Sequence, residues 1–339
     1  MEFLPTLWFV IIAYLWTGYL LLEGFDLGVG MLMKLFARTD QDRRVLLNTV
    51  GPVWDGNEVW LITAGAATFA AFPLWYASLF SALYLPLLLV LMGLIFRAVG
   101  FEYRGKGNND AWRTRWDWAI ALGSLVSAFG IGAALALTTT GLPINDNGDR
   151  VGGAFAWFNG YAVLGGSAVV LFSLVHALGF LVLKTDGEIR ARARRQFLRW
   201  MPWGLLPMAV WAIVVHSSGG KGITWLTLML AVGGAAFAWV MARRRRDGWS
   251  FIGMAAFLAA GTTTIFTAAF PVVLPSTLDA AFDLTVANAS SSGYTLSVMS
   301  VVALVGLPGV LVYQGWTYWV FRKRVSRSHI PPAHAVTAQ

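Results

Sequence analysis

Four carboxylates lie near the start of the chain, inside stretches that are long and apolar enough to cross a bilayer. They are Glu23, Asp26, Asp55 and Glu58. An ionisable side chain at that depth costs several kcal/mol unless it faces a partner, water or an ion path. Such residues are retained chiefly where the protein uses them, and carboxylates joined by water molecules can pass protons from one to the next.

The spacing of the acids predicts two pairs on two helices. Glu23 and Asp26 share a helix face in LLLEGFDLGVGML, and Asp55 and Glu58 share one in GPVWDGNEVWLITAG. These helices are adjacent in sequence, so the pairs can line one proton path that enters from the cytoplasmic side. An alternative for the first pair is a structural role beside the arginines of residues 38–44. No base lies near the second pair in sequence, which makes Asp55 the better candidate for proton conduction.

The composition indicates that lipid surrounds most of the chain. Of the 339 residues, 57% are hydrophobic and only 12% are charged, and the mean hydropathy is +0.64. A soluble domain typically carries about 25% charged residues, so this chain has too little charge to cover an aqueous surface. Cys is absent, which excludes disulfides, iron–sulfur clusters and thiolate metal sites. Any redox chemistry must therefore belong to a bound cofactor or to a partner chain.

Apolar segments of about 20 residues predict an all-α polytopic membrane protein with nine transmembrane helices. The basic residues support this count, because cytoplasmic loops hold the excess of positive charge. All but two of the 25 Lys and Arg residues, namely Arg150 and Lys221, fall on one side, which puts the N-terminus outside and the C-terminus in the cytoplasm. The net charge of +8 is thus a topology signal, and we expect no nucleic-acid partner. The nine helices are expected at residues 6–36, 47–71, 75–100, 116–140, 154–184, 201–217, 223–242, 249–274 and 294–321.

Other charged residues near the membrane surface have less specific roles. Arg97 and Glu102 lie at the cytoplasmic end of the third expected helix, and Asp117 lies in the first turn of the fourth, where the helix dipole favours an anion. We interpret these three as interfacial anchors or docking charges. His176 is expected in the fifth helix, where a lone histidine is more often a hydrogen-bonded core residue than a ligand. We therefore assign no catalytic, cofactor-binding or metal-binding residue to this chain.

Six segments, in order along nearly the whole chain, resemble subunit 2 of the cytochrome bd quinol oxidases and of their cyanide-insensitive relatives. The most specific is WDGNEVWL at residues 54–61. The segments are GFDLGVGML (24–32), RRVLLNTVGPVWDGNEVWLITAGAATFAAFP (43–73), FRAVGFEYR (96–104), LKTDGEIRARARR (183–195), FPVVLPST (270–277) and YTLSVMS (294–300).

The resemblance implies an architecture and a partner. The family has nine helices, arranged as two four-helix bundles and one peripheral helix, so we expect a first bundle with the intramembrane acids in residues 1–140. Residues 141–339 would form the second bundle, the extra helix and a short basic tail. The family forms an obligate heterodimer with subunit 1, which carries haems b and d and the quinol-oxidising loop. That complex sits in the bacterial cell membrane, draws on the quinol pool and reduces dioxygen to water. It takes protons from the cytoplasm and builds a proton gradient without pumping.

The resemblance also implies roles for single residues. Asp55 matches a member of the proton path toward the haems, and Glu23 and Asp26 match acidic positions of the family. Trp60, in the same segment as Trp54, matches a residue beside the apolar oxygen route at the subunit interface. A structural quinone or a lipid in a groove, and small accessory subunits, are compatible with the family. No residue here indicates either one, or whether the donor is menaquinol or ubiquinol.

Two departures from the family pattern affect the expected proton path. Glu58 stands where some members have Gln, and the extra carboxylate can change how the path binds protons. Val53 stands where members have a His just before the WD pair, so a relay through that position is in doubt.

Two other functions compete with the oxidase subunit. A proton-coupled secondary transporter would also have intramembrane acids and Gly-rich helices, but it should place polar groups in corresponding halves of the chain. Here the acids gather in the first two helices, which favours the oxidase. A purely structural assembly subunit predicts that Asp55→Asn leaves turnover intact in the assembled complex.

Overall fold

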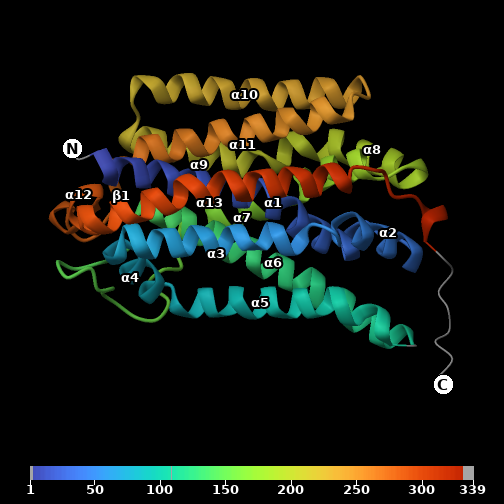
Figure 1. Cartoon of the computed structure of the whole chain (residues 1–339), viewed down its shortest axis with the longest axis horizontal. Helices are drawn as coiled ribbons and strands as arrows, with labels where there is room; N and C mark the ends of the chain where they lie inside the picture. Colours follow the sequence, from blue (N-terminus) through green and yellow to red (C-terminus); the bar gives the residue numbers. More distant parts are fainter. Residues whose placement is uncertain (1–2, 108, 331–339) are drawn as a thin grey trace.

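The computed structural model describes residues 3–107 and 109–330, which form a bundle of long helices lying side by side (Figure 1). The two-stranded hairpin lies at one end of the bundle (Figure 1). The long helices are α1 (Phe3–Leu35), α3 (Trp54–Ala71), α5 (Tyr84–Tyr103), α6 (Asp110–Thr140), α7 (Gly160–Lys184), α10 (Gly222–Arg243), α11 (Asp247–Ala269) and α13 (Gly293–Val320). The shorter elements are α2 (Asp40–Val50), α4 (Pro73–Ala82), α8 (Gly187–Gly204), α9 (Leu206–Gly219), α12 (Val286–Ala289), the 3-10 helices η1 (Arg104–Lys106), η2 (Ala280–Phe282) and η3 (Arg327–His329), and the antiparallel strands β1 (Val272–Leu274) and β2 (Leu284–Thr285).

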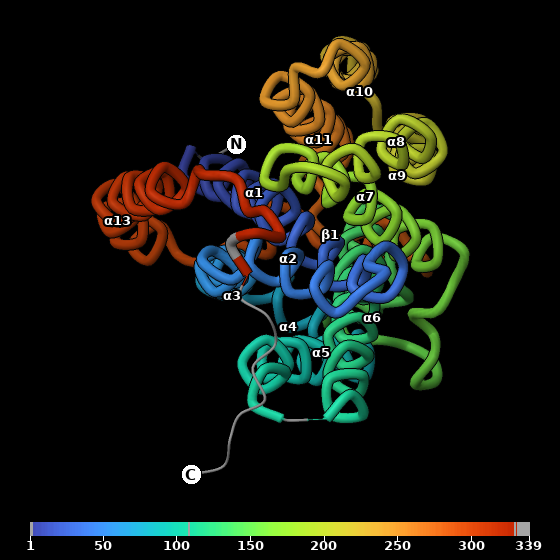
Figure 2. Tube along the Cα trace, turned by 90° about the vertical axis from the view of Figure 1, so that its right-hand side faces the viewer, coloured from blue at the N-terminus to red at the C-terminus, as the bar shows by residue number. Residues whose placement is uncertain are grey.

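Helix α1 lies in the interior and packs against α3, α6, α7 and α11 (Figure 2). Two of its glycines explain how the neighbours come so close. A side chain at Gly28 would overlap the backbone carbonyl of Ser173 in α7, and one at Gly18 would overlap the indole ring of Trp60 in α3. Small residues permit this packing in membranes, where van der Waals contact replaces the hydrophobic effect between helices. The acids of α1 are therefore held inside the bundle.

Two of the expected helices are broken, so the predictions of single helices over 47–71 and 75–100 are wrong. The first is divided into α2 and α3 around Pro52, and the second into α4 and α5 before Pro86. Proline lacks a backbone N–H, and its ring clashes with the carbonyl four residues earlier. The carbonyl that Pro86 displaces is that of Ala82, and it instead accepts a hydrogen bond from Arg150 Nη1 at 3.2 Å. The expected helix at 201–217 is also interrupted, since α8 ends and α9 begins around Leu205, just before Pro207.

Eight segments of the described chain are long and apolar enough to cross a membrane, by length and composition. This supports a multi-pass all-α membrane protein. Helix α3, which corresponds to the second expected span, is not one of the eight. Asp55 and Glu58 lie among its 18 residues and lower its hydropathy. The eight segments are Phe3–Leu35, Tyr84–Lys106, Asp110–Thr140, Gly160–Lys184, Gly187–Gly219, Gly222–Arg243, Asp247–Ala269 and Gly293–Val320.

Helix α13 lies at the periphery of the bundle (Figure 2). Only Leu296 and Gln314 of its 28 residues are buried in the chain. Its exposed side chains are mostly apolar, including Val301, Leu304 and Val305, each at least 67% exposed. This helix therefore presents most of its surface to lipid or to another chain.

Candidate functional site

The two acids of α1 are completely buried, on a helix that packs against α3, α6 and α7. Glu23 Oε1 lies 2.5 Å from Nη1 of Arg97, which is also completely buried on α5. A buried ion pair is costly to form but still more costly to break, because removing one partner leaves the other charge uncompensated. The structure therefore gives Glu23 a counter-ion that spacing along the sequence did not suggest.

Arg97 is shared with a second acid. Glu58 of α3 places Oε2 3.5 Å from the same Nη1 atom, and its side chain is 18% exposed. One guanidinium thus connects α1, α3 and α5. Its contact with Glu58 is longer and lies closer to the surface than its contact with Glu23.

Asp26 belongs to a neighbouring group of hydrogen bonds centred on Asn57. The Asn57 amide donates to Asp26 Oδ2 at 2.6 Å. Its oxygen accepts from Gln314 Nε2 and from the Tyr318 hydroxyl, both at 2.8 Å. These bonds join α1, α3 and α13 inside the bundle. Sequence reasoning missed Gln314 and Tyr318, although a lone Gln in an apolar helix is a usable signal because a buried amide requires partners.

Asp55 lies in the first turn of α3 and is exposed on the surface of this chain. It forms no ion pair with any described side chain, whereas Glu58, three residues later, reaches inward to Arg97. The second predicted pair is therefore divided between the surface and the interior. The structure brings Glu23, Asp26 and Glu58 together and leaves Asp55 on the outside of α3.

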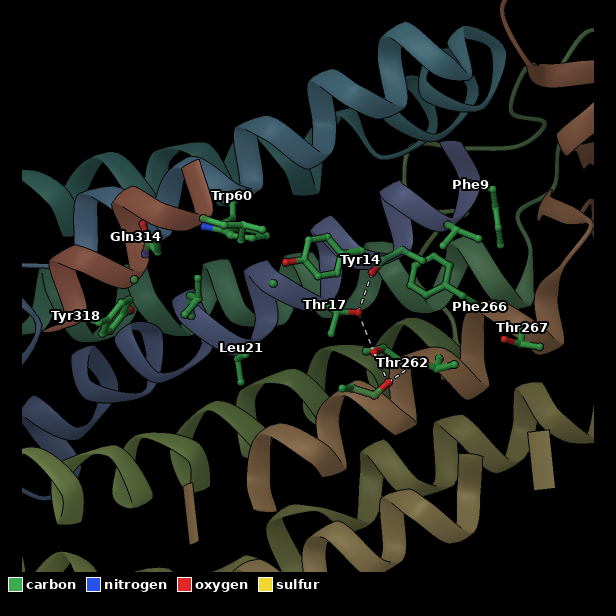
Figure 3. Close-up of a pocket in the computed structure, with 18 residues that line it drawn as sticks. Phe9, Tyr14, Thr17, Leu21, Trp60, Thr262, Phe266, Thr267, Gln314 and Tyr318 are labelled. Carbon is green, nitrogen blue, oxygen red and sulfur yellow. Dashed lines mark hydrogen bonds between the residues drawn. The ribbon is translucent and has the colours of Figure 1, made fainter. Parts of the chain in front are cut away.

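Trp60 is 6% exposed and packs against α1, with its ring centroid 6.0 Å from that of Tyr14. It lines a pocket of about 730 Å³ between α1, α11 and α13 (Figure 3). The walls are mainly apolar, with hydroxyls such as those of Thr17 and Thr262, which lie 2.9 Å apart. Trp54 does not line this pocket and packs instead on Phe101 of α5, with ring centroids 5.3 Å apart.

The three expected anchor or docking charges have three different environments. Arg97 is the buried counter-ion described above and is not an interfacial residue. Asp117 is also buried, with Arg104 Nε at 2.5 Å and Arg43 Nε at 3.4 Å. Glu102 is exposed. Arg43 of α2 therefore pairs with Asp117, while Glu23 pairs with Arg97.

A second buried carboxylate at the basic end of the bundle holds α2 in place. Asp42 accepts from Arg192 Nη2 at 2.8 Å, from Arg327 Nη2 at 2.6 Å and from the Arg38 backbone N–H at 3.1 Å. Burial by itself raises the pKa of the Asp42 carboxyl, but these donors outweigh burial and hold that pKa below its ordinary value. The cluster links α2, α8 and the segment after α13.

Asp247, at the start of α11, likewise holds neighbouring segments together through arginines. It is 6% exposed and accepts from Arg190, from Arg194 Nη2 at 2.6 Å and from Arg324 Nη2 at 3.4 Å. Sequence reasoning treated these arginines only as a topology signal. The structure shows that several of them also tie α8, α11 and the segment after α13 to one another.

His176 is completely buried in α7. Its Nε2 lies 2.9 Å from the Leu21 carbonyl, and its ring stacks between Phe172 and Phe251. A histidine bonded and enclosed in this way fits a core role. Across residues 3–107 and 109–330, no group of three or more His, Asp or Glu side chains is arranged to hold a metal ion.

Comparisons with known proteins give one consistent result. The family model for cytochrome bd terminal oxidase subunit II matches residues 4–321. The cytochrome bd ubiquinol oxidase subunit 2 of Bacillus subtilis (strain 168) is 42% identical over 333 residues, which cover 96% of this chain and 98% of that protein. The cytochrome bd-I ubiquinol oxidase subunit 2 of Escherichia coli (strain K12) is 34% identical over 367 residues, with 97% of each chain covered. A chain from the structure of bd oxidase from Geobacillus thermodenitrificans has a TM-score of 0.77 at 17% identity, covers 95% of this chain and is itself covered completely; this likeness concerns the fold alone.

Proposed function

The chain belongs to the cytochrome bd terminal oxidase subunit II family, and from this premise we propose how it serves the oxidase. It is the second subunit of a cytochrome bd quinol oxidase, an oxidoreductase complex, and this membership replaces the alternative of a proton-coupled transporter. Our proposal is that it stabilises the haem-bearing subunit 1 as an obligate partner. It also supplies part of that subunit's access to protons and oxygen.

One observation carries the proposal for protons. Asp55 is exposed on α3, and Glu58, three residues later, reaches the buried Arg97. A carboxylate at a membrane helix surface is expected to face water or a partner, since lipid gives it neither. We propose that Asp55 faces subunit 1 and passes protons between the cytoplasmic side and the haems, with Glu58, Glu23 and Asp26 as the inner members of the path.

The haems belong to subunit 1 in this proposal. His176 is enclosed by phenyl rings and bonded through Nε2 to the Leu21 carbonyl, which supports a core role for this histidine and not that of a haem ligand. For oxygen and apolar ligands, we propose the pocket beside Trp60. This pocket suits oxygen passage, a structural quinone or a lipid tail, because its walls are mostly apolar.

We propose that the chain crosses the bacterial cell membrane nine times. The eight apolar segments plus α3 give that number, and α1 begins at one end of the bundle while α13 ends at the other (Figure 1). An odd number of spans requires the first span to begin on one side of the membrane and the last to end on the other. We further propose the outside N-terminus, the division into residues 1–140 and 141–339 as two bundles with one extra helix, and room on the exposed α13 for lipid or small accessory subunits.

The experiment that tests the proposal is purification of the chain from native membranes in mild detergent. We expect it to bring a haem-bearing chain with it, to give b- and d-type bands in the reduced-minus-oxidised spectrum and to show quinol-dependent oxygen uptake. A colourless and partnerless chain from membranes that contain an active oxidase would contradict the proposed partnership.

A further inference from the structure

Four charged side chains in the bundle interior do not balance one another. Glu23, Asp26 and Glu58 are acids, and Arg97 is the base that lies among them. Glu23, Asp26 and Arg97 are completely buried. We call these four residues the Arg97 cluster. If every member were ionised, three negative charges would face one positive charge inside the membrane.

No other cation among the described residues corrects this imbalance. Among the described residues, Glu23 and Glu58 form their ion pairs with Arg97, and Asp26 is hydrogen-bonded to Asn57. From α13, Tyr318 contributes a hydroxyl that is bonded to Asn57, and from α7 the His176 ring is bonded to the Leu21 carbonyl. The remaining facing groups, Tyr19 of α1 and Asp55 of α3, add no positive charge.

Burial makes a surplus of negative charge unfavourable. An isolated carboxylate in a low-dielectric interior is so costly that the group takes up a proton instead. Two acids that share a single counter-ion at short range bind protons as one group, so the proton belongs to the cluster and not to a fixed residue.

We propose that the Arg97 cluster holds at least one proton in the resting protein, and that Arg97 positions this proton by keeping Glu23 ionised. The Arg97–Glu23 distance is 2.5 Å and the Arg97–Glu58 distance is 3.5 Å, so Glu23 is the better compensated anion. Glu58 and Asp26 are the carboxyls that take the proton. Asp26 keeps one oxygen, Oδ1, without a hydrogen-bond partner among the described residues.

The cluster also has the polar atoms that proton movement requires. Glu23 Oε2, Arg97 Nε and Nη2, and the Tyr19 hydroxyl are buried without a hydrogen-bond partner in the described part of the chain. Buried polar atoms of this kind are where ordered water binds. A proton that leaves Glu58 through such water leaves a carboxylate behind, and uptake of one proton from the cytoplasmic side restores the starting charge.

This inference rests on the proposed function only for the use of the proton, because its storage depends on charge and burial alone. The test is infrared spectroscopy of the intact oxidase complex at neutral pH. A protonated carboxyl has a C=O stretch that is distinct from carboxylate bands and shifts in D₂O. We expect such a band in the unmodified complex and its loss or weakening in Glu58→Gln or Asp26→Asn.

Variants of Arg97 test whether this residue positions the proton by keeping Glu23 ionised. Arg97→Gln removes the only cation, so the cluster should gain one further protonated carboxyl, while Arg97→Lys keeps the charge and should keep the band near its original intensity. Arg97→Lys, Glu58→Gln and Asp26→Asn keep the inference testable should Arg97→Gln fail to assemble. The matched control is Glu102→Gln, an exposed glutamate on the same helix, which should leave the band unchanged.

The outcomes distinguish storage of a proton in the Arg97 cluster from use of that proton in the proposed proton path. Absence of the band in the unmodified complex, or a band that no variant of the cluster alters, overturns the inference. A band that disappears in Glu58→Gln while quinol-dependent oxygen uptake stays intact supports storage and contradicts the proposed proton path.

Discussion

Arg97 on α5 and Glu23 on α1 form an ion pair in which both side chains are completely buried. The pair connects α1, in the interior of the bundle, with α5. It also explains how an acid can lie at the centre of α1 without reaching the surface. The same guanidinium extends to Glu58, so one residue organises both acidic helices.

We expect Arg97→Gln to lower the free energy of unfolding by about 3–5 kcal/mol, because Glu23 is left buried and uncompensated. The double variant Glu23→Gln/Arg97→Met removes both charges and should be the less destabilised of the two. Thermal unfolding of the purified complex measures both. A loss in the double variant equal to the sum of the losses in the single variants Glu23→Gln and Arg97→Met would mean that the two charges are not coupled.

Asp55→Asn should lower quinol-dependent oxygen uptake of the assembled complex by about tenfold or more, since a proton-transferring side chain commonly contributes 10²–10⁴-fold. The haem spectrum should not change, because Asp55 is exposed and forms no ion pair with a described side chain of this subunit. Asp110→Asn, another exposed acid, is the control. Unaltered turnover in a fully assembled Asp55→Asn complex would favour a purely structural subunit.

Asp42 makes stability dependent on acidity. Its pKa in the folded protein lies below the ordinary value of 3.8, so its stabilising contribution is fully present above 3.8 and is lost as the pH falls through the lower folded value. We expect Asp42→Asn to lower the melting temperature at pH 7. The gap in melting temperature between the variant and the unmodified protein should shrink as the pH falls, because Asp42 becomes protonated. Melting curves from pH 7 down to pH 3 measure this. The same gap in melting temperature at every pH would show that Asp42 does not cause the pH dependence of stability.

Gln314→Leu should destabilise the packing of α13 by about 1 kcal/mol, because the Asn57 oxygen loses one of its two donors from α13. Adding Tyr318→Phe removes the second donor and should cost more than either change alone. Protease accessibility and melting temperature of the complex report the effect. Thr317→Val, at a half-buried position of the same helix whose hydroxyl donates to the Tyr313 carbonyl within α13, should be close to neutral.

The broken helices show where sequence reasoning was sufficient and where averaging misled it. Pro52 and Pro86 are visible in the sequence, and the rule that proline interrupts a helix applies to both. A window of about 20 residues averages such breaks away, so 47–71 and 75–100 were predicted as continuous. The family assignment did not suffer, because it depends on the residues of WDGNEVWL and the other segments and not on the exact ends of helices.

The sequence by itself determined that this is a multi-pass membrane protein with acids at membrane depth, because hydropathy and charge are properties of each segment alone. It also determined which helix carries each acid. Only the tertiary structure decided that Glu23 and Glu58 share Arg97, that Asn57 connects Asp26 with Gln314 and that Asp55 lies outside. These facts depend on how each helix is rotated about its axis and which neighbour it meets, and close contacts at Gly18 and Gly28 set both. Such contacts join residues far apart in the chain, and no local pattern encodes them.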